Sequence, residues 1–167
     1  MSIPKKWLVF YTQSRQEKKV RDLLLRNGFE VFLPLQKVMR QWSDRKKKVE
    51  APLFNSYIFV FESEDKITSI LQTPGVAWNI RYNDKPAELR PKELTTIQRF
   101  LESGLLLETG PIEKLTPGDF VEVVDGPLKS MVGEVLRTKD DTKFVVALDS
   151  IGQSLLVTID TSLLKSI

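Results

Sequence analysis

The chain has 167 residues, with neither cysteine nor histidine, and its formal net charge is +3. Without these two residue types it cannot form a histidine-based catalytic triad, a thiol nucleophile or a common zinc site. Catalysis by carboxylates alone is disfavoured, because the acidic residues are scattered among basic ones and no pair stands in an apolar setting. We therefore expect a binding protein that is not an enzyme and that needs no metal or cofactor.

The charge is distributed unevenly along the chain. Residues 1–104 contain 19 lysines and arginines against 12 acidic residues, a net +7, whereas residues 105–167 contain 6 against 10, a net −4. A basic half joined to an acidic half suggests different partners, and nucleic acid is the first candidate for the basic half.

Nothing in the sequence indicates a membrane or secreted protein. No apolar run approaches the roughly 20 residues that span a bilayer. The N-terminal sequence MSIPKKW is not followed by the apolar segment of a secretion signal. The absence of cysteine agrees with the cytoplasm. We expect a cytoplasmic monomer that does not bind membranes.

The first 104 residues predict a mixed α/β sandwich in which helices cover a sheet. Aromatic and β-branched runs indicate strands, and apolar residues three and four apart indicate helices. A capping box from Ser14 to Glu17 predicts the start of the first helix, and Pro91 suits the first position of the third, with Leu94, Ile97 and Leu101 inward. In chain order we expect a strand over 7–12, a helix to about Arg26 ended by Asn27-Gly28, a strand over 29–33, a basic hairpin over 35–50 with Ser43-Asp44 near its tip, a strand over 55–61, a short helix capped by Ser63, a strand over 76–81 and a helix ended by Gly104.

The last third of the chain predicts a separate all-β domain, so the fold class is α+β. Residues 105–114 show no clear periodicity, and we interpret them as a linker between domains 1–104 and 115–167. Four or five short strands follow, separated by turns at Asp125-Gly126, Asp140-Asp141 and residues 150–152. That spacing is typical of a small, SH3-like five-stranded barrel.

One stretch within this domain is especially informative: LTPGDFVEVVDGPLKSMVGEVL, residues 115–136. A Pro-Gly turn leads into an alternating strand, Asp125-Gly126-Pro127 turns the chain, and Gly133 lies in the next strand. The stretch resembles a KOW motif, which occurs in transcription elongation factors and some ribosomal proteins. Any small β-barrel with a glycine bulge is the alternative.

Taken together, the two halves resemble the NusG family of transcription elongation factors, in which an NGN domain precedes a KOW barrel. The resemblance rests on the opening WLVFYTQSRQEKKV, on Pro52–Val60 and on Thr73-Pro74-Gly75-Val76. Housekeeping members usually have Phe-Pro-Gly-Tyr where this chain has Phe54-Asn55-Ser56-Tyr57. The run RQWSDRKKKVEAPLFNSYIFV is similar to the UpxY-type antiterminators of capsular polysaccharide operons.

The resemblance implies a regulator that binds the clamp helices of RNA polymerase and suppresses pausing or termination, at specific long operons in the specialised branch. The non-template DNA strand or nascent RNA would be a second partner. A ribosome-associated or RNA-binding KOW protein that never binds polymerase is the main alternative.

Trp7, Phe54 and Tyr57 are the residues that the resemblance assigns to polymerase docking. Core aromatics of the sandwich are the alternative interpretation. In the strand after Phe54, Tyr57 and Phe59 face one side while Ile58 and Val60 face the other. At least one of these two faces must pack under helices.

The second candidate set could bind nucleic acid, because charge meets phosphates and an interleaved aromatic ring can stack on bases. The alternative is an ordinary solvated surface. The set comprises Arg15, Lys18, Lys19, Arg40, Trp42, Arg45, Lys46, Lys47, Lys48 and Arg81.

The third set is the predicted barrel loop of Ile151, Gly152 and Gln153. The resemblance implies an exposed apolar residue here that contacts the termination factor Rho or a small ribosomal-subunit protein. The alternative is a loop residue that folds back on the barrel.

Overall fold

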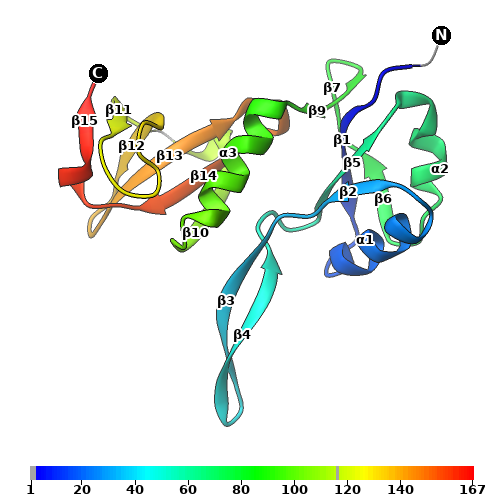
Figure 1. Cartoon of the computed structure of the whole chain (residues 1–167), viewed down its shortest axis with the longest axis horizontal. Coiled ribbons are helices and arrows are strands. Elements are labelled where there is room, and N and C mark those ends of the chain that lie inside the picture. Colours follow the sequence, from blue (N-terminus) through cyan, green and yellow to red (C-terminus); the bar gives the residue numbers. More distant parts are fainter. Residues whose placement is uncertain (1–2, 116) are drawn as a thin grey trace. The chain divides into compact units, whose positions relative to one another are not determined.

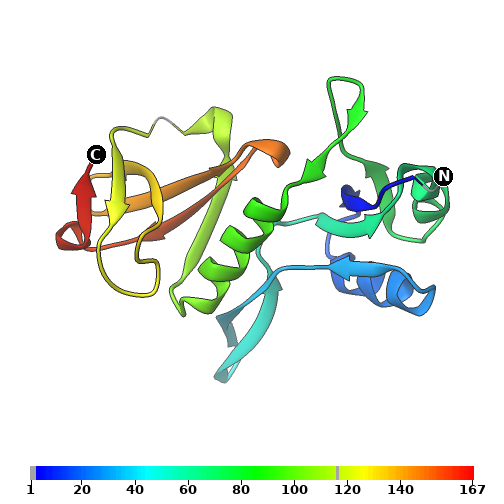
Figure 2. The same cartoon turned by 45° about the horizontal axis from the view of Figure 1, so that its top comes forward.

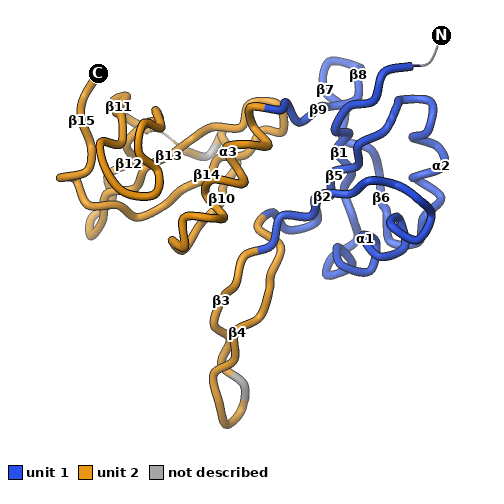
Figure 3. The backbone as a smooth tube through the Cα atoms, viewed as in Figure 1, with its two compact units in different colours: residues 1–35, 54–91 blue, residues 36–53, 92–167 orange. Residues whose placement is uncertain are grey.

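The computed structural model describes residues 3–115 and 117–167, except for the side chains of Trp42 and Lys114. The chain forms two compact units, each made of two segments. Unit 1 comprises residues 1–35 and 54–91, and unit 2 comprises residues 36–53 and 92–167 (Figure 3). In the described part of the chain, no helix is long and apolar enough to cross a membrane.

Unit 1 is an antiparallel sheet with helices on one face (Figure 1). The strands run in the order β2-β5-β1-β6, and β9 also pairs with β1. The elements are β1 (Lys6–Thr12), α1 (Glu17–Arg26), β2 (Glu30–Phe32), β5 (Tyr57–Glu62), a 3-10 turn (Glu64–Lys66), α2 (Ile67–Leu71), β6 (Val76–Asn79), β7 (Arg81–Tyr82), β8 (Lys85–Pro86) and β9 (Glu88–Leu89).

The core of unit 1 lies between the sheet and its two helices. Register pairs Leu8 with Val60 and Phe10 with Ile58, so these four side chains share one face of β1 and β5. They pack with Val20 and Leu24 of α1 and Ile70 of α2. The face that carries Ile58 and Val60 is therefore the one under the helices, and the face that carries Tyr57 and Phe59 lies on the other side of the sheet.

The predicted side-chain caps of the first two helical segments are wrong, although the end of α1 is confirmed. The helix starts at Glu17, and its N-cap position is Gln16 rather than Ser14, with no side-chain cap. Ser63 does occupy the N-cap position of the next helical segment, but its hydroxyl makes no capping hydrogen bond and instead donates to the carboxylates of Glu62 and Asp65. Gly28, at φ 88°, follows the end of α1 as predicted.

Unit 2 contains the basic hairpin, the third helix and a six-stranded antiparallel sheet, which we call the barrel sheet. Its strand order is β10-β14-β13-β12-β11-β15. The elements are β3 (Leu35–Trp42), β4 (Arg45–Pro52), α3 (Pro91–Glu102), β10 (Leu107–Pro111), β11 (Phe120–Val123), β12 (Val132–Arg137), β13 (Thr142–Leu148), β14 (Gln153–Thr158) and β15 (Leu164–Ser166), with 3-10 turns at Ile112–Lys114, Asp149–Ile151 and Thr161–Leu163.

The segment that we interpreted as an irregular linker contains a strand. β10 pairs with β14 from Leu107 to Pro111, so the sheet has six strands rather than five. The pairing depends on main-chain hydrogen bonds to a distant strand, and a side-chain pattern broken by Gly110 and Pro111 does not reveal it. The assignment of 1–104 and 115–167 to separate functions stays a prediction.

Helix α3 packs against the barrel sheet, within unit 2 (Figure 2). The Phe100 ring stacks on the Phe144 ring of β13, with centroids 6.3 Å apart and planes 6° from parallel. Arg99 donates to the main-chain carbonyl oxygens of Pro127 and Lys129. Ile97 is buried as predicted, whereas the buried Phe100 was not predicted.

Candidate functional site

The face of the unit 1 sheet opposite α1 and α2 carries a continuous row of aromatic rings. Strand register places Trp7 opposite Phe61 and Tyr11 opposite Tyr57 across β1 and β5. Because side chains alternate along a strand, these rings share the face of Phe59. We call this surface the aromatic face; its members are Trp7, Tyr11, Phe32, Phe54, Tyr57, Phe59, Phe61 and Trp78.

Ring contacts hold the aromatic face together. The centroids of Trp7 and Phe61 are 5.2 Å apart, and those of Tyr11 and Tyr57 are 5.8 Å apart in an edge-to-face arrangement. Tyr11 stacks on Trp78 of β6 at 4.4 Å and 7°. Such contacts fix the orientations of the rings before any partner arrives.

Exposure separates rings that could touch a partner from rings that support them. Phe54 is only 2% exposed and contacts both Tyr57 and Phe59, so it acts as a support. Trp7 and Tyr57 are half-buried, and Trp78 is 53% exposed. The structure therefore brings the three predicted docking residues to one surface, and the most exposed ring is one that the prediction missed.

A buried carboxylate fixes the turn that presents Phe54 and Tyr57. Glu17, the first residue of α1, is 5% exposed, and its Oε2 accepts a hydrogen bond of 2.8 Å from the Ser56 main-chain N–H. The Ser56 carbonyl accepts from Thr12 N–H at 2.7 Å. Ser56 adopts φ 69°, a left-handed conformation that glycine takes readily, which accounts for the glycine common at this position in the resembling sequences.

The Glu17→Ala variant should lose about 1–3 kcal/mol of folding free energy, because it leaves the buried Ser56 N–H without an acceptor. Urea denaturation of the full chain measures the loss. Glu17→Gln is the matched control. Its side-chain amide oxygen can accept the same hydrogen bond, so it should lose clearly less folding free energy. Equal stability of Glu17→Ala and the parent would show that the contact does not secure the turn.

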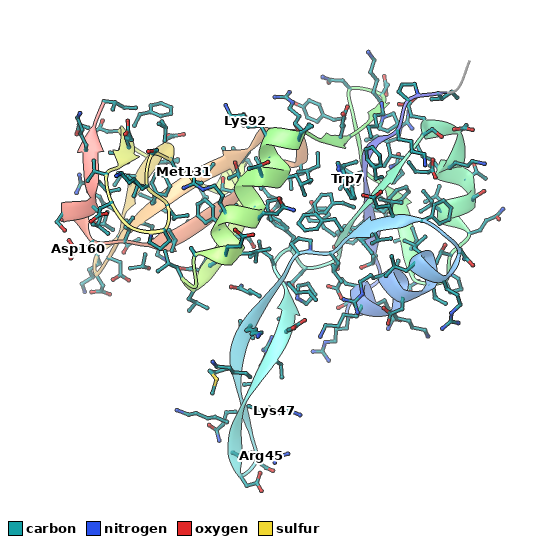
Figure 4. The ribbon with its side chains drawn as sticks, in the orientation of Figure 1. Trp7, Arg45, Lys47, Lys92, Met131 and Asp160 are labelled. Carbon is teal, nitrogen blue, oxygen red and sulfur yellow. The ribbon has the colours of Figure 1, made fainter. Side chains whose placement is uncertain are left out.

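The basic candidates fall into two groups that belong to different units. Arg40 and the run from Arg45 to Lys48 lie on the predicted hairpin, whose strands meet at Ser43-Asp44 as expected. Figure 4 shows Arg45 at the tip and Lys47 further along β4. All five of these basic residues are exposed. The Trp42 side chain lies outside the described residues.

The other basic candidates belong to unit 1 and are also exposed. Lys18 and Lys19 lie in the first turn of α1, and Arg15 precedes it with φ 64°. Arg81 begins β7 and donates to the Asp84 carbonyl oxygen at 2.7 Å. Among the candidate residues, the hairpin therefore carries the densest basic cluster on one element.

The barrel loop differs from its predicted form, because Ile151 is 6% exposed rather than accessible. The residue ends a 3-10 turn, and Gly152 then takes a left-handed φ of 68° as the chain enters β14, where Gln153 is half-buried. Glu93 of α3 accepts from the Ser150 N–H at 3.2 Å, which ties the loop to the helix. The expectation of an exposed apolar contact here is therefore wrong.

Five members of the aromatic face were not among the predicted site residues: Tyr11, Phe32, Phe59, Phe61 and Trp78. The signal for Tyr11 was present, because it follows Trp7 and Val9 at alternate positions of a recognised strand. Trp78 gave no comparable signal, since its neighbour Tyr11 is distant in the sequence. Among the described residues, no group of three or more acidic side chains could hold a metal ion.

A helix-backed sheet with a row of aromatic rings, followed by a small β domain with a glycine-containing turn, has the two-part architecture of the NGN and KOW class. The chain belongs to the NusG family: the family model described as "Transcription termination factor nusG" matches residues 5–98, more than half of its length.

Individual relatives agree with this assignment. The chain is 29% identical over 142 residues to the transcription termination/antitermination protein NusG of Rickettsia felis, a match that spans 78% of this chain and 73% of that protein. The NusG of Rickettsia prowazekii is 28% identical over the same shares. A solved structure of Thermotoga maritima NusG, described by its domain interaction, superposes with a TM-score of 0.58 at 19% identity, covering 98% of this chain and 97% of that one, and shows the same fold.

Proposed function

We propose that this protein regulates transcription elongation by binding the clamp helices of RNA polymerase through its aromatic face, suppressing pausing or termination. The observation that carries the proposal is the row of mutually oriented rings on the side of the unit 1 sheet opposite α1 and α2. Family membership supports it, because the matched relatives are named as termination/antitermination proteins.

The physical properties of the aromatic face suit a protein interface better than a catalytic site. Aromatic residues are enriched in the centres of protein interfaces, and tryptophan and tyrosine often supply most of the binding energy. Trp78 is stacked, exposed and located on the edge strand β6, so a partner can reach it without rearranging the sheet.

The proposal includes a specialised role at long operons, as the UpxY-like hairpin sequence suggests. It is tested against the alternative of a ribosome-associated protein by measuring the affinity of the full chain for core RNA polymerase and for small ribosomal subunits. Tighter binding to polymerase supports the proposal. Binding to ribosomal subunits alone would contradict it.

The basic hairpin is proposed as a second contact, for single-stranded nucleic acid. Replacing Arg45, Lys46, Lys47 and Lys48 with glutamine should weaken binding of an oligonucleotide and flatten its salt dependence. Each phosphate contact contributes a slope of about −0.7 in the logarithm of affinity against the logarithm of salt concentration, so four lost contacts change it by about 3 at most.

A charge-matched control separates a local contact from the effect of net charge. The control replaces four exposed lysines elsewhere in unit 2 with glutamine: Lys92, Lys129, Lys139 and Lys165. Fluorescence anisotropy at several salt concentrations gives both slopes. If the two quadruple variants change the slope equally, the hairpin is not the nucleic-acid contact.

A further inference from the structure

The barrel sheet contains a small apolar pocket that no predicted site includes. Its volume is about 160 Å³, enough for one branched aliphatic side chain. Val123 and Leu128 are each 1% exposed and form its buried part. The pocket is lined by Leu105, Val123, Asp125, Pro127, Leu128, Thr158, Ile159, Asp160 and Leu163.

Two exposed carboxylates accompany this apolar lining. Asp125 follows β11. Asp160, labelled in Figure 4, precedes the 3-10 turn that leads into β15. The Asp160 Oδ1 accepts from the Ser162 N–H at 2.9 Å, and this main-chain hydrogen bond lowers the pKa of Asp160 below its usual value. Among the described residues that line the pocket, none is a lysine or an arginine.

Hydrogen bonds from residues that do not line the pocket hold its wall in place. Arg99 of α3 donates to the carbonyl oxygens of Pro127, at 3.4 Å, and Lys129, at 3.0 Å. Met131 N–H donates to the Leu128 carbonyl at 3.0 Å and closes the same loop. A pre-positioned wall lowers the ordering cost that a ligand would otherwise meet on binding.

We propose that this pocket binds a short segment of a basic protein partner, with one aliphatic side chain in the pocket and flanking lysines or arginines beside Asp125 and Asp160. Charge complementarity selects this occupant, because the two charged residues that line the pocket, Asp125 and Asp160, are both acidic. An acidic segment or nucleic acid would meet like charge at the rim. The site involves neither the aromatic face nor the predicted loop at Ile151.

The test uses capped pentapeptides and the full, isotope-labelled chain. The probe Lys-Lys-Leu-Lys-Lys is compared with Lys-Lys-Ser-Lys-Lys, which lacks the aliphatic group, and with Ala-Ala-Leu-Ala-Ala, which lacks the charges. Amide chemical shifts are followed by NMR. We expect the first peptide to move the signals of Val123, Thr158 and Asp160, with at least fivefold weaker binding of the other two.

Charge-neutralising variants then test the rim. Asp125→Asn and Asp160→Asn should each weaken binding of the first peptide about twofold to fivefold, as expected for exposed ion pairs. Asparagine also accepts main-chain hydrogen bonds at such positions, so the turn after Asp160 should persist. Asp140→Asn, which removes an exposed charge from the turn between β12 and β13, is the matched control and should bind like the parent.

Three results would overturn the inference. The first is equal binding of the leucine and serine peptides, and the second is equal weakening by all three asparagine variants. The third is a set of pocket signals that shift with protein concentration alone, which would show a second copy of the chain in the pocket. Because no polymerase is present, none of these results bears on the proposed docking function.

Discussion

The Ile151→Asp variant should lose about 3–5 kcal/mol of folding free energy in unit 2, because it places an unpaired charge at a buried site. Ile151 is 6% exposed, and the neighbouring Ser150 N–H is bound by Glu93 of α3. Urea denaturation, followed through amide signals of the barrel sheet, measures the loss.

Ile167→Asp is the matched control for this change. Ile167 belongs to the same unit and is 65% exposed, so the same substitution should cost little there. If Ile151→Asp is as stable as Ile167→Asp, the Ile151 side chain is accessible in solution and the loop again becomes a candidate partner site.

The Gly133→Ala variant should destabilise the barrel sheet by about 2 kcal/mol, within the usual range for overpacking a well-filled site. A Cβ at Gly133 would lie 2.5 Å from the Val145 carbonyl oxygen and 2.9 Å from two carbons of the Phe144 ring. The ring cannot simply move away, because its other contacts include the stacked Phe100 of α3. Thermal denaturation measures the effect.

Gly118→Ala tests whether the effect is specific to Gly133. Gly118 precedes β11, and its added Cβ would lie at an ordinary 3.5 Å from the Val135 carbonyl oxygen, with no positive φ to oppose the change. We expect this variant to be close to the parent in stability. If Gly133→Ala and Gly118→Ala unfold at the same temperature, β12 must shift to accommodate the added methyl group.

Local patterns predicted the elements whose signals lie within a few residues. The hairpin turn at Ser43-Asp44, the end of α1 at Asn27-Gly28 and the two-faced strand at Tyr57 all depend on neighbouring residues. The KOW-like stretch predicted a strand at Gly133, and β12 confirms it; the close approach of Phe144 explains why a residue without a side chain stands there.

The features that could not be predicted depend on partners distant in the sequence. Glu17 looked like a capping residue, but its carboxylate accepts a hydrogen bond from the main-chain N–H of Ser56, which is distant in the sequence. Ile151 looked like a loop tip, but it is buried in a loop that is bound by Glu93. Strand β10 can be recognised as a strand only from its pairing with β14.

The candidate site also combines residues that the sequence could identify with residues that only the structure could identify. Trp7 and Tyr57 could be selected from the strands and the family resemblance, and the structure places both on the aromatic face. Phe54 could not be distinguished from a contact residue by sequence, although it is buried and supports its neighbours. Trp78 became a candidate only when the pairing of β1 with β6 placed it on Tyr11.

The equilibrium affinity of core RNA polymerase for the full chain and its Trp78→Ala variant tests the central claim most directly. Trp78 is exposed, so the substitution should leave the fold intact, and loss of an interface tryptophan typically costs about 2 kcal/mol, roughly thirtyfold in affinity. Tyr82→Ala, at a 71% exposed aromatic residue of the β7–β8 hairpin, is the matched control and should bind like the parent. A folded Trp78→Ala variant with the affinity of the parent would contradict docking through the aromatic face.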